Sequence, residues 1–250
     1  MSILLSAWVP GLPLVLAAEK SPKWKVLDEA FKKLGKRVAD LNPDVLVIHS
    51  SQWLSVLGTS FQTQANPKGL HVDENWYEWG DLPFNFKSDV ALSEGFAKAV
   101  EAKGLPTKTV NFEEFPIDTG TIVALRYLNP NQKIPVAIVS SWVYADPAKA
   151  RLIGQTMGES LKASGKKAVV IASSLLSTRF FTGEIDPVKD QVSHATDDEW
   201  NQKILKGFAH GDLEREGAMA ADCFRSSPTT MKFNGFHWHK GRLHTEKVKR

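Results

Sequence analysis

The run Asp44-Val45-Leu46-Val47-Ile48-His49 decides the fold class of this chain. Its apolar residues are consecutive rather than alternating, which is typical of a strand covered on both faces in a mostly parallel sheet. Other short apolar runs predict further strands over residues 3–9, 107–112, 134–140 and 168–172.

Segments with helical spacing of apolar residues alternate with these strands. They predict helices over 24–41, 88–104 and 147–164, with Ser88 as the N-cap of the second. A capping box from Thr196 to Glu199 predicts one more helix. This order predicts an α/β fold, with a mostly parallel or mixed central sheet and helices on both faces.

Length and composition favour a single globular domain. The chain has 250 residues, of which 42% are hydrophobic and 24% are charged, so disordered and fibrous classes are excluded. We expect one domain over 1–240, followed by a basic tail over 241–250. A net charge of +3 is too small to indicate nucleic-acid binding.

Two features bear on the cellular compartment. Cys223 is the single cysteine, so an internal disulfide is impossible and a reducing cytoplasm is expected. The apolar segment 3–18 has no Lys or Arg before Lys20 and is broken by Pro10, so we expect neither export nor a membrane span.

The predicted strands end in hydroxyl-bearing and aromatic residues. Parallel strands place their carboxyl ends at one edge of the sheet, where ligands bind in open α/β folds. Those ends are Pro10-Gly11, Ser50-Ser51-Gln52-Trp53, Ser140-Ser141-Trp142 and Ser173-Ser174. They are consistent with a pocket for a small aromatic molecule, or with serines that only cap the following helices.

A catalytic or metal-binding set is hard to find among the titratable residues. Of the seven histidines, His237 and His239 are close in sequence, but no carboxylate lies between them and Phe224. His49, at the end of a buried strand, is expected to hydrogen-bond locally. Asp118 precedes Thr119 and Gly120 at a turn, and its simplest interpretation is a helix N-cap.

Four segments together resemble the class III extradiol ring-cleavage dioxygenases, the protocatechuate 4,5-dioxygenase-like superfamily. They are Pro10-Gly11-Leu12-Pro13, the stretch 44–53, Asp118-Thr119-Gly120-Thr121 and the stretch 173–177. The segments 71–78 and 115–122 are similar, more specifically, to the alpha subunits of the aminophenol dioxygenases within that superfamily.

The resemblance implies that this chain has lost the iron site of the catalytic members. The family's two histidine ligands are matched by Gly11 and Gln52, its glutamate ligand by about Thr230, and its catalytic histidine by Thr178. We therefore expect a vestigial pocket at these four residues, with no catalytic residue, metal ligand or cofactor in this chain. Fe(II) is expected in a homologous beta subunit, within an α2β2 heterotetramer that opens the ring of 2-aminophenol or a substituted 2-aminophenol.

Three hypotheses follow for the chain itself. A structural subunit would contact its partner, with Trp76, Tyr77 and Trp79 as the candidate interface, although these rings can instead pack on their own domain. A second hypothesis is an aromatic-ligand-binding regulatory module. A third is an active metal-dependent dioxygenase with another ligand set, using His237 and His239.

Overall fold

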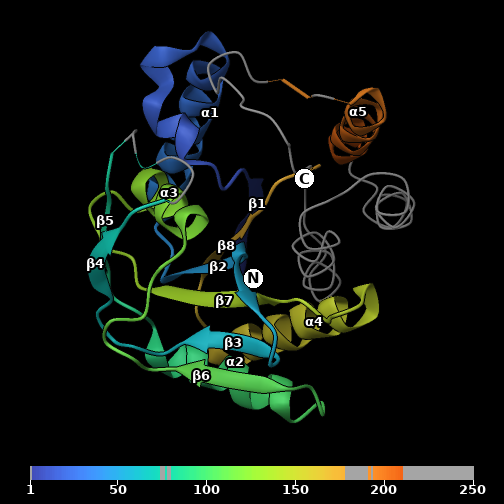
Figure 1. The fold of residues 1–250 in the computed structure, drawn as a ribbon. Helices are drawn as coiled ribbons and strands as arrows, with labels where there is room; N and C mark the ends of the chain where they lie inside the picture. Colours follow the sequence, from blue (N-terminus) through green and yellow to red (C-terminus); the bar gives the residue numbers. More distant parts are fainter. Residues whose placement is uncertain (1, 74–76, 78–79, 178–190, 193, 211–250) are drawn as a thin grey trace.

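A computed structural model describes residues 2–73, 77, 80–177, 191–192 and 194–210. Its centre is a six-stranded sheet in the order β1-β8-β2-β7-β3-β6 (Figure 1). The strands are β1 Ile3–Val9, β2 Val45–Ser55, β3 Thr59–Gln62, β6 Thr107–Val110, β7 Val136–Trp142 and β8 Ala168–Ser173. Every neighbouring pair is parallel except β3 and β7, so the predicted mixed sheet is confirmed.

Helices cover both faces of the sheet, as predicted (Figure 1). One face carries α1 (Pro22–Leu41) and α3 (Thr119–Leu128), and the other carries α2 (Val90–Glu101) and α4 (Pro147–Ser164). A 3-10 helix η1 (Pro13–Lys20) follows β1, and α5 spans Ala195–His210. A second sheet pairs β4 (Lys68–His71) with β5 (Leu82–Asn85) in antiparallel fashion.

The core consists of two apolar layers because successive residues of a strand point to opposite faces. In β2, Leu46 and Ile48 belong to the layer under α1 and α3, whereas Val45 and Val47 belong to the layer under α2 and α4. The consecutive apolar run of β2 is thus the consequence of burial on both faces.

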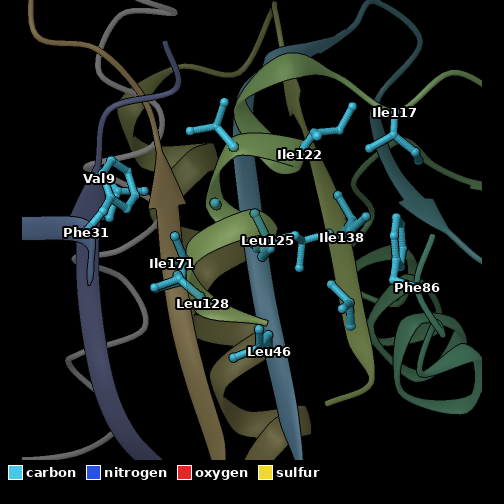
Figure 2. Packing of buried hydrophobic residues seen from close by; sticks show 14 of the residues in the cluster. Val9, Phe31, Leu46, Phe86, Ile117, Ile122, Leu125, Leu128, Ile138 and Ile171 are labelled. Carbon is cyan, nitrogen blue, oxygen red and sulfur yellow. The ribbon is translucent and has the colours of Figure 1, made fainter. Parts of the chain in front are cut away.

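Figure 2 shows the first of these layers from close by. Leu46, Ile138 and Ile171, from three neighbouring strands, meet Leu125 and Leu128 of α3. All five side chains are buried, so this layer fixes the position of α3 and of the segment that opens it.

Two predicted helix starts are wrong. Asp89, rather than Ser88, caps α2, because its carboxylate accepts from the Leu92 amide at 3.2 Å. The predicted capping box from Thr196 to Glu199 is not used, since α5 begins at Ala195.

Strand bounds also differ from the prediction. The strand predicted to end at His49 continues to Ser55, the strand predicted to begin at residue 134 begins at Val136, and the strand predicted over 107–112 ends at Val110. Within the described residues, no helix is long and apolar enough to cross a membrane.

Candidate functional site

Three serines align near the carboxyl ends of three neighbouring parallel strands. Ser50 of β2 is in register with Ser140 of β7 on one side and with Ser173 of β8 on the other. Val9, the last residue of β1, is in register with Ser173. The predicted hydroxyl-rich edge is therefore confirmed, and its serines form one continuous row across the sheet.

A bulge in β2 lifts Gln52 out of this edge. Pairing with β7 shifts between Ser50 and Leu54, so residues 51–53 leave the regular ladder. Bulges of this kind re-aim side chains next to functional sites. The Gln52 side chain donates from Nε2 to the Gly11 carbonyl at 2.7 Å and accepts at Oε1 from the Gly120 amide at 2.6 Å.

Neither neighbouring glycine has room for a side chain. A Cβ on Gly11 would lie 2.9 Å from Ser173 Oγ and 3.3 Å from Gln52 Nε2. One on Gly120 would lie 2.6 Å from Ser173 Oγ and 3.1 Å from Gln52 Oε1. Gly11, Gln52, Gly120 and Ser173 therefore form a close-packed group, which we call the glutamine plug.

Asp118 joins the plug to the start of α3. Its carboxylate accepts from the Thr121 amide at 3.0 Å, the Thr121 hydroxyl at 2.7 Å and the Ser50 hydroxyl at 2.5 Å. The predicted N-cap is thus confirmed, and one carboxylate serves the helix and the neighbouring strand end together.

A second polar group lies at the same helix start. Thr119 donates its hydroxyl proton to Asp73 at 2.6 Å, and its oxygen therefore accepts from His71 Nε2 at 2.9 Å. These bonds fasten the end of β4 and the residues after it to the first turn of α3. Sequence reasoning missed this group, because nothing local in residues 71–73 indicates a partner near residue 119.

Gly11 and Gln52, the described residues at the positions matched to the histidine ligands, do not fit a ferrous ion. Such a site needs two imidazoles and a carboxylate, whereas Gly11 has no side chain and both polar atoms of the Gln52 amide are bonded to backbone groups. In the part of the chain that the structure describes, no three His, Cys, Asp or Glu side chains are grouped as metal ligands.

The expected site residues are only partly visible. Gly11 and Gln52 lie side by side, and Tyr77 has 61% of its surface exposed. The remaining predicted residues lie outside the described part of the chain: Trp76, Trp79, Thr178, Cys223, Thr230, His237 and His239.

His49 does not stand at the strand end as expected. It lies within β2, only 3% exposed, and burial lowers its pKa from 6.5 to about 3. The imidazole is therefore neutral at physiological pH, and its burial in the sheet makes it a structural residue.

Asp118→Ala is expected to lower the free energy of unfolding by roughly 2–3 kcal/mol, since it removes a helix cap and leaves the buried Ser50 and Thr121 hydroxyls without their acceptor. The matched control is Asp146→Ala, which removes an exposed cap of α4 and should cost about 1 kcal/mol. Urea unfolding of both variants measures the difference, and equal losses would contradict the role given to Asp118.

Comparison with known proteins adds independent information. A family model described as the catalytic LigB subunit of aromatic ring-opening dioxygenase matches residues 4–227. The alpha subunit of a 2-aminophenol 1,6-dioxygenase from Pseudomonas sp. is 33% identical over 244 residues, which cover 97% of this chain and 90% of that protein. A 2-aminophenol 1,6-dioxygenase beta subunit from Pseudomonas sp. is 26% identical, covering 86% of this chain and 74% of its own length.

A solved structure supports the fold alone. The crystal structure of an uncharacterized protein from Escherichia coli K12 matches with a TM-score of 0.62 at 16% identity. The match covers 88% of this chain and 82% of that chain, so the two chains share the α/β architecture over most of their lengths.

Proposed function

We propose, on the premise that this chain belongs to the LigB family of aromatic ring-opening dioxygenase subunits, that it is the non-catalytic alpha subunit of a heteromeric dioxygenase. The holoenzyme would open the ring of 2-aminophenol or a substituted 2-aminophenol with O2. The iron would be held by a homologous beta subunit in an α2β2 assembly, which fits the similarity of this chain to both an alpha and a beta subunit.

One observation carries the non-catalytic role. Gly11 and Gln52, the residues matched to the two histidine ligands, are bonded to each other, and the Gln52 amide is also bonded to Gly120. A neutral amide with both polar atoms occupied is a poor iron ligand. At the positions matched to the iron ligands, the glutamine plug is thus packed and hydrogen-bonded within the fold.

The chain's contribution would then be a surface that the catalytic subunit needs. The segment 70–73 supplies a candidate for that surface, because His71 and Asp73 point inward to Thr119. The alternate residues Leu70 and Val72 are 58% and 48% exposed. Apolar side chains on the outside of a segment whose polar side chains face the domain indicate a covered surface in the assembly.

Tyr77 is a further exposed side chain, close to this segment in the sequence. It is exposed and follows the anchored residues within a few positions, next to Trp76 and Trp79 in the sequence. Aromatic residues are enriched at interface centres, which favours this surface over a random patch.

A cytoplasmic location, expected from the single cysteine, stays a prediction.

Leu70→Ser with Val72→Ser is expected to weaken association with the beta subunit by about tenfold or more, since both apolar side chains would leave the contact. The melting temperature of the chain should change little, because the two side chains are exposed in the free subunit. The matched control is Val26→Ser, an exposed apolar residue of α1. Co-purification and a titrated binding assay measure the effect, and wild-type affinity in the double variant would exclude this surface.

Subunit mixing tests the proposed function as a whole. The beta subunit, this chain and the mixture are each assayed for oxygen uptake with 2-aminophenol. Turnover that requires the beta subunit and rises when this chain is added supports the proposal. Full turnover by the beta subunit alone, unchanged by this chain, contradicts it.

A further inference from the structure

A groove lies at the end of the sheet opposite the glutamine plug. It runs between the last turns of α1 and the segment 126–134, beside the residues that lead into β2 and β7. Its volume is about 570 Å³, within the range of small-molecule sites. Nothing in the proposed function uses this groove.

The side chains that line the groove have one sign of charge. Lys32, Lys36, Arg126 and Lys133 line it, together with neutral residues and no Asp or Glu. Lys32 is paired with Asp28 at 2.6 Å, whereas the other three cations have no carboxylate partner among the described residues. Three positive charges therefore line the groove without a carboxylate partner among the described residues.

The ends of two helices also belong to the groove and offset part of this charge. Asn42 caps the carboxyl end of α1, and Asn129 caps that of α3. Each helix end contributes about half a negative elementary charge. Against three full positive charges, the balance stays positive by about two charges, so the groove attracts anions.

The walls and floor of the groove narrow the class of anion. They are largely apolar, formed by Gly35, Ala39, Pro43, Leu128, Pro130 and Ile134. Helix carboxyl ends present carbonyl groups rather than the N–H donors with which phosphate is cradled. A ligand with an apolar body and one carboxylate satisfies both the lining and the charge.

The groove is also held in shape before any ligand binds. Asn129 donates from Nδ2 to the Ile134 carbonyl at 2.8 Å and accepts at Oδ1 from the Ile134 amide at 3.1 Å, which closes the loop 129–134. On the other wall, a Cβ on Gly35 would lie 2.2 Å from the Tyr127 carbonyl oxygen, so α1 and α3 are in direct backbone contact. Because these walls are already ordered, less conformational entropy is lost when a ligand binds.

We infer that this groove is a binding site for a small organic monocarboxylate with an apolar body, for which benzoate is a suitable probe. The apolar body lies on the walls of the groove, and the carboxylate pairs with Lys36 and Lys133. The inference stands on the groove alone and does not depend on the role of the plug or of the beta subunit.

Isothermal titration of the full chain, in the assembly in which it purifies, tests the site with benzoate. Benzyl alcohol supplies the same ring without the charge, and inorganic phosphate supplies charge without the ring. We expect saturable binding of benzoate, with binding of the other two probes at least about tenfold weaker. Lys36→Ala with Lys133→Ala should weaken benzoate binding by about tenfold.

The matched control is Lys33→Ala with Arg37→Ala, which removes two exposed positive charges of α1 that do not line the groove. It should leave benzoate affinity within about twofold, as expected for charges outside the site. The site would be overturned by the absence of saturable benzoate binding, by equal losses in the two double variants, or by phosphate binding as tightly as benzoate.

Discussion

Acidification from pH 6.5 to pH 3 is expected to lower the free energy of unfolding of this chain by roughly 4 kcal/mol through His49 alone. His49 lies in β2, in register with Val139 of β7 and Ala172 of β8, and is 3% exposed. Burial lowers its pKa from 6.5 to about 3, because the charged imidazolium would lose its hydration inside the sheet.

The direction of the effect follows from proton uptake by the two states. Below pH 6.5 the unfolded chain binds a proton at His49, whereas the folded chain does not bind it until about pH 3. Stability from the neutral histidine is therefore complete above pH 6.5 and decreases as the pH falls toward 3. Its slope is about 1.4 kcal/mol per pH unit for one proton.

His49→Gln is the variant that isolates this contribution, since it keeps a polar side chain that cannot be protonated. Urea unfolding between pH 7 and pH 4 should show a shallower loss of stability in the variant than in the wild type. An identical slope in His49→Gln and wild type would refute the role of this histidine.

Gly58→Ala is expected to destabilise the fold by roughly 3 kcal/mol or more. Gly58 turns the chain between β2 and β3 with φ of +126°, a conformation that alanine rarely adopts. An added Cβ would also lie 2.2 Å from the Pro106 carbonyl oxygen. That oxygen accepts from the Thr59 amide at 2.9 Å, so neither backbone can move without loss of a hydrogen bond.

Gly80→Ala separates the two causes. Gly80 has φ of +109°, and a Cβ there would have nothing within 4 Å. Gly80→Ala therefore introduces backbone strain without a clash. It should lower the free energy of unfolding by about 1–2 kcal/mol. Chemical denaturation of both variants gives the comparison. If Gly58→Ala were as stable as Gly80→Ala, the clash with Pro106 would add no cost. The strands β3 and β6 could then move apart freely, contrary to this prediction.

The parts of the fold that sequence alone predicts are those with local signals. Helix α4 spans Pro147–Ser164 as expected, because Asp146, Pro147 and Gly165 mark its two ends. The strand β3, Thr59–Gln62, was missed because its four residues are mostly polar and its place beside β7 depends on the turn at Gly58. A short polar strand buried by its neighbours has no periodic pattern of its own.

The site shows the same division between local and tertiary information. Capping by Asp118 is a local feature, and the sequence predicts it. The prediction of Ser88 as the cap of α2 was wrong. Asp89 caps this helix, and its ion pair with Lys166 across the fold is not visible in the sequence. The glutamine plug likewise depends on the β2 bulge and on the register of Ser173, which only the folded sheet defines.

Iron content is the measurement that tests the non-catalytic role of this chain most directly. The chain is purified alone and with its beta subunit under anaerobic conditions with ferrous iron, and bound iron is counted together with turnover of 2-aminophenol. We expect no stoichiometric iron and no turnover in the chain alone, and one iron for each pair of chains in the active complex. Stoichiometric iron with turnover in the chain alone would contradict the assignment of Gly11 and Gln52 to the lost ligand positions.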